Sequence, residues 1–528
     1  MKGKPPVTLS RRRNAVIASS LLLGLAAPAT PALAKAASKT SATKPAVAKT
    51  PAPAKTTAPA KSTVKAAATA TTAPTLASRM TAVKVAKTLN YYPDTAGWSK
   101  MWTNFNATQI NADLAKAQAL GADNVRAILF PTTMGYPTPT ATYMDRLSQF
   151  VTMAAAHNMT VKFTLFDWWD GYSDVAGSTT WARAVLTPYK DDKRVISVEV
   201  KNEFDAADAA GVAWAKKIVP AIRSIAPTMP LTFSVDGTAG ATGMAKIKAA
   251  LVASPLDFYD FHFYGNSERA LANIRKAQAA VTPTPVVIGE VGLNTLQNTD
   301  GEQAAFLARV FEAAKVAGIG SVAPWTLYDF TSTAIPTSQV SQLPAQYNYG
   351  LYHTDGSAKP AAAVVKAEWT GTALPADLFD PSFELTADAS PWSAYLPQLG
   401  VGVRTTSAAH TGKWSVSFTR TGKDPSGAPS IRVAPITPVQ SGQKWHGEVW
   451  IKGNAATGQS QIALSWFDAN DKWLGGASSA SLPVGTHNWT KLSVDGIAPA
   501  GSASMQIHLK SGANSGTIWF DDVAVSNS

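Results

Sequence analysis

The 528-residue sequence contains no cysteine. Disulfide bonds, thiolate nucleophiles and cysteine-ligated zinc sites are therefore excluded. A chain without disulfides must be stabilised by hydrophobic cores of adequate size. The length favours two or three domains, and the composition of 45% hydrophobic and 16% charged residues suits globular domains with long apolar strands and helices.

Acidic residues are absent from the first 87 positions, which carry 15 lysines and arginines. The remaining positions, 88–528, have a net charge of −3, although the whole chain has +12. The positive charge therefore belongs to the N-terminal region and not to a folded surface. Binding of nucleic acid is not expected.

Long apolar runs are also lacking, apart from the 13 residues Ala15–Ala27. Three arginines precede this run and Ala32-Leu33-Ala34 follows it as a small-residue cleavage site, so residues 1–34 are predicted to be an export signal. Ser10-Arg11-Arg12 resembles the start of twin-arginine leaders. An uncleaved anchor is the alternative, but the run is short for one. We expect a secreted or periplasmic monomer that has no membrane contact once the signal is removed.

Residues 35–80 consist mainly of alanine, lysine, threonine and proline. Repeated proline and the scarcity of large apolar side chains preclude a packed core. This range is predicted to be a disordered, extended, cationic linker. Contact of the same range with anionic cell-wall polymers is an alternative.

Strand-like and helix-like segments alternate between residues 81 and 372. Eight strand-like runs, each followed by a stretch able to form a helix, predict a (β/α)8 TIM barrel. An open doubly wound sheet is the alternative, but no glycine-rich phosphate turn follows the first run. The eight runs are VKVAKTLNYY, NVRAILF, VKFTLFDWW, VISVEVKNE, PLTFSVDG, FYDFHFYG, PVVIGEVG and IGSVAPWTLYDF.

Helical periodicity disappears in residues 379–528. Short alternating runs punctuated by glycine, serine, asparagine and aspartate predict an all-β, jelly-roll-like sandwich. Eight of the 16 tryptophans of the chain lie in this range. Some must belong to the core, and exposed ones such as Trp473 are expected to stack on polysaccharide. A purely structural sandwich is the alternative.

The ends of the predicted barrel strands carry most of the residues suited to chemistry. In such barrels the functional side chains lie at the C-terminal ends of the strands. These strand ends carry Arg126, Asp167, Trp168, Trp169, Asn202, Glu203, His262, Tyr264, Glu290 and Trp325. Two carboxylates with an arginine, a tyrosine and several tryptophans at one barrel mouth suit glycoside hydrolysis, in which two carboxylates flank the scissile bond.

Five of these segments resemble motifs of the clan A retaining glycoside hydrolases, and of family 5, the cellulase-like family, in particular. The stretch VEVKNEF is similar to their strand-4 motif, and VVIGEVG is similar to their strand-7 nucleophile motif. GADNVRAILF, FHFYG and PWTLYDF resemble the segments that carry an arginine, a His-x-Tyr pair and a tryptophan. The resemblance spans about residues 85–370. It implies hydrolysis of β-linked polysaccharide or oligosaccharide, β-1,4-glucan or β-mannan first, without a cofactor or a catalytic metal.

The resemblance also implies a role for each candidate residue. Glu203 would be the acid/base and would need a raised pKa. Glu290 would be the nucleophile, and Asn202 would hold the sugar 2-hydroxyl.

The other candidate residues are implied to support Glu290 or to hold the sugar. Arg126 and Tyr264 would bond Glu290, and an adjacent guanidinium lowers a carboxylate pKa. His262 would line the site, Trp325 would lie under the sugar at the cleavage point, and Trp168 would contribute a stacking surface.

Two positions depart from the family pattern. Phe204 stands where proline is usual, and the third strand ends in FDWWD where many members have a histidine pair. These differences leave the substrate class open. Within the fourth strand we interpret Glu199 and Lys201 as a buried ion pair inside the barrel. Arg126 as a structural ion-pair partner is an alternative to its catalytic role.

The alternatives for function are an exo-acting or transglycosylating clan A enzyme, and a non-catalytic protein that binds cell wall or exopolysaccharide. The presence of both Glu203 and Glu290 argues against the second. The stretches FDPSFE and IWFDDVAV resemble carbohydrate-binding β-sandwich modules. By that resemblance, Glu384 and Asp521 are candidates for a structural calcium site.

Overall fold

The computed structural model describes residues 73–387, 389–420 and 428–528. The predicted export signal, residues 1–34, lies outside the described residues, and so does most of the predicted linker, residues 35–80.

The end of the predicted linker needs correction, because helix α1 (Leu76–Val83) begins within it. The Thr75 side chain accepts the backbone N–H of the third helical residue and completes a capping box. Arg79 is only 3% exposed and donates to the backbone oxygens of Lys190 and Asp192, each at 3.0 Å. These contacts join α1 to the barrel, which the alanine-rich and threonine-rich composition had concealed.

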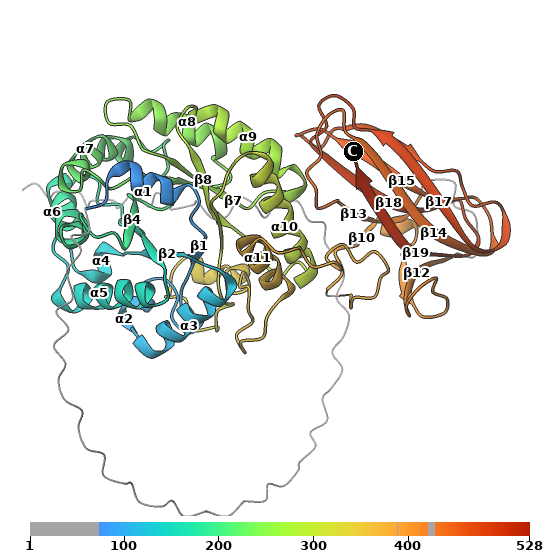
Figure 1. Ribbon diagram of the computed structural model, residues 1–528, viewed down its shortest axis with the longest axis horizontal. Coiled ribbons are helices and arrows are strands. Elements are labelled where there is room, and N and C mark those ends of the chain that lie inside the picture. The colour runs from blue at the N-terminus through green and yellow to red at the C-terminus, as the bar shows by residue number, and fades with distance from the viewer. Residues whose placement is uncertain (1–72, 388, 421–427) are drawn as a thin grey trace, which may run out of the picture.

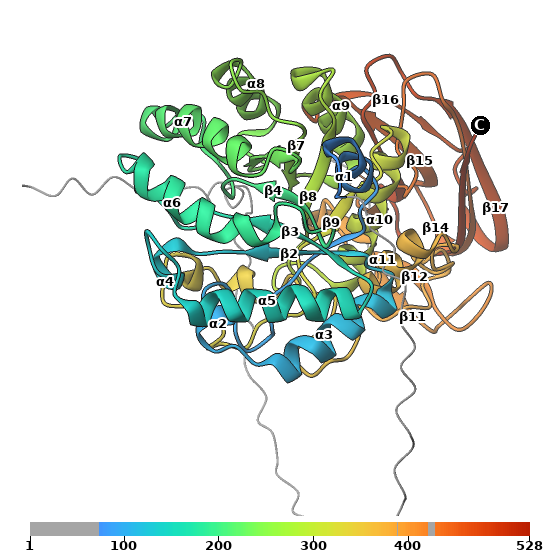
Figure 2. The ribbon, with the colours of Figure 1, turned by 60° about the vertical axis from the view of Figure 1, so that its left-hand side comes forward.

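Parallel strands form the barrel, in two hydrogen-bonded groups ordered β1-β2-β3-β4-β5 and β6-β7-β8-β9 (Figures 1 and 2). β5 and β6 are the two halves of the fifth predicted strand, interrupted at Phe233. The first and last strands lie side by side, because Asn90 Nδ2 donates to the carbonyl oxygens of Ala323 and Pro324. The predicted TIM barrel is therefore confirmed. Its strands are β1 (Thr88–Asn90), β2 (Asn124–Ile128), β3 (Thr160–Thr164), β4 (Val195–Glu199), β5 (Leu231–Thr232), β6 (Ser234–Val235), β7 (Tyr259–Phe263), β8 (Val286–Val291) and β9 (Val322–Pro324).

Helices surround the strands (Figure 2). In α5 the buried residues Leu147, Phe150, Val151 and Ala154 recur at helical spacing, and burying each large side chain contributes about 1.5–3 kcal/mol. Among the described residues, none of the helices is both long and apolar enough to cross a membrane. The α-helices after α1 are α2 (Lys100–Thr103), α3 (Ala107–Leu120), α4 (Pro131–Met134), α5 (Ala141–Ala156), α6 (Val175–Leu186), α7 (Ala209–Ile225), α8 (Gly240–Ala250), α9 (Ala270–Val281), α10 (Asp300–Val316) and α11 (Pro360–Thr370). The 3-10 helices are η1 (Thr187–Tyr189), η2 (Ser267–Arg269), η3 (Val340–Gln342), η4 (Pro344–Tyr347) and η5 (Pro397–Leu399).

The inside of the barrel is charged. Five polar side chains from four strands meet there, each at most 6% exposed: Arg126, Lys162, Glu199, Asp260 and His262. Buried charges are tolerated only when they are paired and hydrogen-bonded. These five residues are therefore positioned by one another as much as by their strands.

The C-terminal domain is an all-β sandwich of two antiparallel sheets, ordered β10-β13-β18-β15-β16 and β11-β12-β19-β14-β17. Along β14, buried residues alternate with partly exposed ones from Trp445 to Gly453, as expected when one face of a sheet is in the core. The strands are β10 (Ser393–Tyr395), β11 (Val403–Thr405), β12 (Ser415–Arg420), β13 (Ser430–Val433), β14 (Lys444–Ala456), β15 (Gln459–Phe467), β16 (Trp473–Ser478), β17 (Gly485–Ile497), β18 (Ser504–Gly512) and β19 (Gly516–Asn527).

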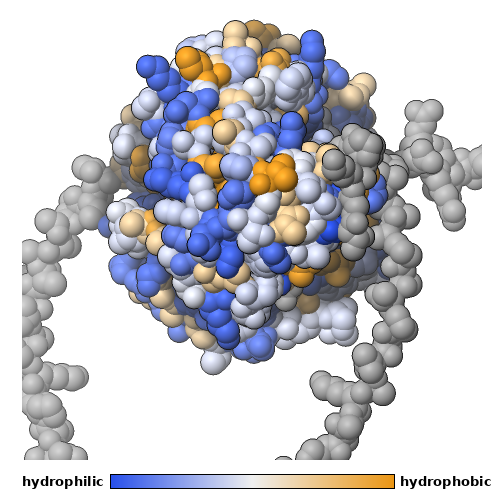
Figure 3. All heavy atoms as spheres, turned by 90° about the vertical axis from the view of Figure 1, so that its right-hand side faces the viewer, coloured by the Kyte–Doolittle hydropathy of each residue, from blue (hydrophilic) through white to orange (hydrophobic). Residues whose placement is uncertain are grey.

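The sandwich packs against the α9 and α10 side of the barrel (Figure 1). Arg309 of α10 donates to the backbone oxygens of Ala434 at 2.8 Å and Pro435 at 3.1 Å. Arg269 pairs with Asp471 at 2.8 Å. The sheet that contains β13 and β18 faces the barrel, so the other sheet faces solvent. Figure 3, viewed from the sandwich side, shows small apolar areas separated by hydrophilic ones.

Candidate active site

Glu203 reaches the barrel mouth from a turn that follows β4. β4 ends at Glu199, and Glu203 has a positive φ of 43°. Its backbone N–H donates to Ser234 Oγ at 2.7 Å, and the N–H of Phe204 donates to Ser234 O at 3.0 Å. Because β4 ends at Glu199, the turn carries Asn202 and Glu203 and the alternation of the strand no longer applies to them.

Glu290 lies on β8 and is bonded through both carboxylate oxygens. The guanidinium of Arg126, on β2, contacts Oε1. Tyr264, just after β7, donates its hydroxyl to Oε2 at 2.7 Å. The contacts expected for Arg126 and Tyr264 are thus present in the structure.

Glu203, His262 and Glu290 converge at the mouth, each with one polar atom within 4.8 Å of the others. His262 Nδ1 lies 3.3 Å from Glu203 Oε1 and 3.5 Å from Glu290 Oε2. The two carboxylates therefore face one another with the imidazole beside both.

Burial and neighbouring charges separate the two glutamates. Burial raises the pKa of Glu203 well above its usual value, and the negative charge of Glu290 adds to the rise. Burial also raises the pKa of Glu290, but Arg126 and the Tyr264 hydroxyl oppose it. The net direction for Glu290 is upward, and not downward as the arginine alone would suggest. The pKa of Glu203 is thus raised more strongly than that of Glu290, which suits a protonated Glu203 beside an ionised Glu290.

Asn202 is held by the same arginine. Arg126 Nη2 donates to Asn202 Oδ1 at 2.7 Å, and among the described residues the Asn202 amide nitrogen makes no hydrogen bond. A sugar hydroxyl can therefore accept from that nitrogen. Arg126 also bonds Glu199 through Nε at 2.8 Å and Nη2 at 2.9 Å. Arg126 is therefore an ion-pair partner of Glu199 inside the barrel and of the candidate residue Glu290 at the mouth.

The predicted Glu199–Lys201 ion pair is wrong. Glu199 pairs with Arg126 and, at 3.1 Å, with Lys162. Burial would raise the pKa of Glu199, but these two cations outweigh it and lower the pKa. Lys201 instead donates to the backbone oxygen of Trp169 at 2.8 Å. The reason is that β4 ends at Glu199, so Lys201 belongs to the turn and no longer points into the barrel.

Three tryptophans lie in the segments that follow β1, β3 and β9, at the same end of the barrel as the two glutamates. Trp325 is 7% exposed and Trp168 is 40% exposed. Trp98, which the sequence reading missed, lies between them, with its ring centroid 5.7 Å from that of Trp325 and 6.5 Å from that of Trp168. Trp98 lies in the loop after β1, and no motif marked it. Trp181 is fully buried, so it is a packing residue.

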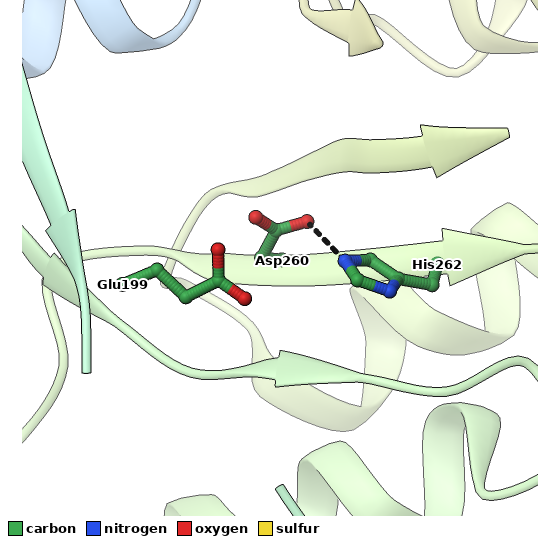
Figure 4. Close-up of side chains that lie close together, drawn as sticks. All are labelled: Glu199, Asp260 and His262. Atoms are coloured by element: carbon green, nitrogen blue, oxygen red, sulfur yellow. Dashed lines mark ion pairs between the residues drawn. The ribbon is translucent and has the colours of Figure 1, made fainter. Parts of the chain in front are cut away.

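Lys162 and Asp260 were also missed. The Lys162 ammonium contacts the Asp260 carboxylate, and it lies 3.1 Å from Glu199. Figure 4 shows Glu199, Asp260 and His262 close together. Their ligating atoms lie within 4.8 Å of one another. A metal ion in that group would have to displace the Lys162 ammonium, which already lies between the two carboxylates.

The two calcium candidates of the sandwich bind backbone. Glu384 Oε1 accepts the N–H groups of Lys413 at 2.7 Å and Trp414 at 2.8 Å. Asp521 Oδ2 accepts the N–H of His410 at 2.6 Å. Among the described residues, groups of three metal-ligating side chains occur only in the barrel. The two carboxylates therefore accept backbone N–H groups of the loop at 410–414. The structure adds no third ligating side chain that would support a calcium site among the described residues of the sandwich.

Comparison with known proteins finds a family that the barrel resembles. Residues 85–330 match the family model "Cellulase (glycosyl hydrolase family 5)". Endoglucanase E-5 of Thermobifida fusca is 24% identical over 243 residues, 44% of this chain and 50% of that protein. The chain thus spans about half the length of this curated relative.

Solved structures to which this chain is similar include two from bacteria. One is exo-β-1,4-mannosidase Op5Man5 of Opitutaceae bacterium strain TAV5, with 19% identity, 54% of this chain covered, 59% of that chain covered and a TM-score of 0.46. The other is GH5_18 of Streptomyces cattleya in complex with GlcNAc, with 18% identity, 56% and 82% covered and a TM-score of 0.47. By the match over residues 85–330, the barrel domain is similar to glycosyl hydrolase family 5, the cellulase family.

Proposed function

We propose that the chain is a retaining glycoside hydrolase that cleaves β-linked polysaccharide by double displacement. The observation that carries the proposal is the approach of a Glu203 oxygen to within 4.8 Å of a Glu290 oxygen. Retaining enzymes hold their two carboxyl groups about 5–5.5 Å apart, and inverting enzymes hold them about 6.5–9.5 Å apart to admit a water.

In this proposal Glu290 attacks the anomeric carbon while Glu203 donates its proton to the departing oxygen. The product of this step is a covalent glycosyl-enzyme and a free leaving group. Glu203, now ionised, takes a proton from water, whose oxygen displaces Glu290 and restores the first configuration. Asn202 holds the 2-hydroxyl, and Arg126 and Tyr264 keep the Glu290 carboxylate in position.

The favoured substrates are β-1,4-glucan and β-mannan. Support comes from the family and from the tryptophans beside the glutamates, since flat aromatic faces pack on the C–H surfaces of sugar rings. Trp168 has the exposed surface for such a contact. The lengths of the first products distinguish cleavage within chains from cleavage at chain ends.

The test is hydrolysis of a polysaccharide panel followed by proton NMR of the first product formed. We expect release of reducing sugar from glucan or mannan, with the β-anomer appearing first. The Glu290→Gln variant, prepared in parallel, controls for contaminating enzymes. Initial appearance of the α-anomer would contradict the retaining mechanism. Failure to hydrolyse any glycan would contradict the proposal that the protein is a glycoside hydrolase.

We also propose that the sandwich binds carbohydrate through its solvent-facing sheet. Trp450 on β14, Trp489 on β17 and Trp519 on β19 are partly exposed on neighbouring strands. Lys452 pairs in register with Trp519. A row of tryptophan rings with polar neighbours suits a sugar chain.

Binding of the full-length protein to insoluble cellulose and mannan tests this surface. We expect Trp489→Ala and Trp519→Ala to bind less than the wild type. Trp473→Ala is the matched variant, because Trp473 is 61% exposed on edge strand β16 of the other sheet. If only Trp473→Ala loses binding, the solvent-facing sheet is not the site.

We propose, finally, that the protein is exported and cleaved after Ala34. The support is the arginine-rich start, the apolar run and the Ala32-Leu33-Ala34 segment. Mass spectrometry of protein from the medium or periplasm should find Lys35 as the first residue. An exported protein that retains residues 1–34 would contradict cleavage.

A further inference from the structure

Two buried polar atoms in the barrel face each other without a hydrogen bond. His262 Nε2 and Asp260 Oδ1 both lack a partner among the described residues, and they lie 3.9 Å apart (Figure 4). Both side chains are fully buried. Burying a polar group without a hydrogen bond is unfavourable, so a small rotation that brings these two atoms into hydrogen-bond contact is favoured.

The Asp260 carboxylate is held in place from two sides. The Lys162 ammonium contacts Oδ2, which leaves Oδ1 for His262. On the next strand, a side-chain carbon at Gly289 would lie 1.9 Å from Oδ1. Glycine at position 289 therefore provides the space in which the carboxylate sits.

Charge decides which imidazole nitrogen carries the proton. Burial, together with the positive charge of Arg126, lowers the pKa of His262 well below its usual value, so the ring is neutral and has one N–H. Burial raises the pKa of Asp260, but the adjacent Lys162 opposes this and favours the carboxylate. A carboxylate beside Nε2 favours the proton on Nε2, and Nδ1 then has a free lone pair.

We propose that Asp260 is a positioning residue that accepts the Nε2–H of His262, so that Nδ1 accepts a hydrogen bond from the protonated Glu203 carboxyl. Nδ1 lies 3.3 Å from Glu203 Oε1. The role for Glu203 rests on the proposed function, but the protonation of His262 does not. The chain Lys162–Asp260–His262–Glu203 thus runs from the barrel interior to its mouth and holds the acid in its protonated form.

Among the described residues, four carboxylates and two cations lie around His262. The carboxylates are those of Glu199, Glu203, Asp260 and Glu290, and the cations are those of Arg126 and Lys162. Of these carboxylates, Asp260 is the one whose unpaired oxygen, Oδ1, lies beside Nε2 in the described structure. The tautomer is therefore assigned by one contact.

Nitrogen-15 NMR of histidine-labelled wild-type protein tests the proposal without any variant. The chain has seven histidines, and His262→Gln identifies the signals of interest by their loss. We expect Nε2 of His262 to give the signal of a protonated ring nitrogen and Nδ1 that of an unprotonated one, across neutral pH. A protonated Nδ1, or protonation of both nitrogens, would overturn the proposal.

Asp260→Asn should reverse the tautomer. Lys162 binds the amide oxygen, so the amide NH₂ donates to Nε2 and the ring proton moves to Nδ1. Nδ1–H then favours ionised Glu203, so the alkaline limb of the pH profile should move to lower pH. Natural glycans, which need protonation of the leaving group, should lose about tenfold or more in kcat/KM, and aryl glycosides of acidic phenols should lose much less.

Asp113→Asn is the matched control, because Asp113 is a buried carboxylate bonded to Tyr91 at 2.7 Å outside this chain of residues. It should change neither the pH profile nor the ratio between the two substrates. An Asp260→Asn variant that slows both substrates equally, with an unchanged pH profile, would reduce Asp260 to a packing role and overturn the proposal. If the wild type hydrolyses no glycan, the proposed function fails, and the NMR experiment alone decides the tautomer.

Discussion

Tyr264 donates its hydroxyl to Glu290 Oε2 at 2.7 Å, on the carboxylate whose other oxygen the Arg126 guanidinium contacts. Within the described part of the chain, Glu203 has no such donors, and His262 Nδ1 lies 3.3 Å from its Oε1. Hydrogen bonds to the charged form of an acid favour ionisation. The asymmetry supports the proposed roles of Glu290, on β8, as the nucleophile and of Glu203, in the turn after β4, as the acid.

The alanine variants of the two glutamates should therefore fail differently. Glu290→Ala removes the group that forms the glycosyl-enzyme, so every substrate should suffer. Glu203→Ala removes protonation of the leaving group, so natural glycans should lose on the order of 10²–10⁴ in rate, while the first step with acidic aryl glycosides survives. Steady-state and burst kinetics on both substrates measure the difference. Near-full activity of Glu203→Ala on a glycan would contradict its role.

The pH profile of kcat/KM should be bell-shaped. Activity falls in acid as Glu290 becomes protonated and falls in alkali as Glu203 loses its proton.

Tyr264→Phe removes one donor to ionised Glu290 and raises the pKa of Glu290 further, so the acid limb should move to higher pH. Because a hydrogen bond to a charged group contributes about 1.5–3 kcal/mol, kcat/KM should fall about tenfold to a hundredfold. Tyr349→Phe, which removes a hydroxyl from the ring packed edge-on against Tyr264, is the control. A shift of the alkaline limb alone would contradict the assignment.

The contact between barrel and sandwich should contribute to the stability of both domains. Arg309→Ala leaves the backbone oxygens of Ala434 and Pro435 without their donor, at a cost of about 1–3 kcal/mol. Calorimetry should show a lower Tm or two separated transitions. Arg275→Ala, which loses only an exposed bond to Gln440, should have little effect. Equal behaviour of the two variants would mean that the domains unfold independently of this contact.

Stability should fall in acid because of a histidine in the sandwich. Burial lowers the pKa of His508 to about 3, against about 6.5 in an unfolded chain. Between these values the unfolded state binds a proton that the folded state does not. His508 therefore does not lower the free energy of unfolding above about pH 6.5. Below that pH it lowers this free energy progressively toward pH 3, by at most about 1.4 kcal/mol per pH unit. Urea unfolding across this range should show a shallower decline in His508→Gln, and His487→Gln, at an exposed site, should match the wild type. An unchanged slope in His508→Gln would contradict the prediction.

The arrangement of strand ends followed from sequence because a parallel barrel brings all the C-terminal ends to one rim. Glu203, Glu290, Tyr264 and Trp325 could thus be placed together before any coordinates. Trp98 could not, because it lies in a loop whose path depends on packing against Trp168 and Trp325.

The buried charges were hidden for a different reason. Parallel strands are buried on both faces, so alternation did not separate the inward Lys162 and Asp260 from residues facing the helices. The position of the Lys201 side chain depends on where β4 ends, and the ends of strands are the least certain part of a prediction from sequence. The packing of the sandwich against α10 has no short-range signal at all, since Arg309 bonds backbone oxygens more than a hundred residues away.

The absence of a side chain at Gly289 links two positions in the history of the family. Because the Asp260 carboxylate fills that space, a side chain at position 289 would force the carboxylate to move. We therefore expect a larger residue at 289 to be disfavoured while the aspartate remains. Related sequences should therefore show covariation between the two positions, with residues larger than glycine at 289 confined to barrels that lack the aspartate.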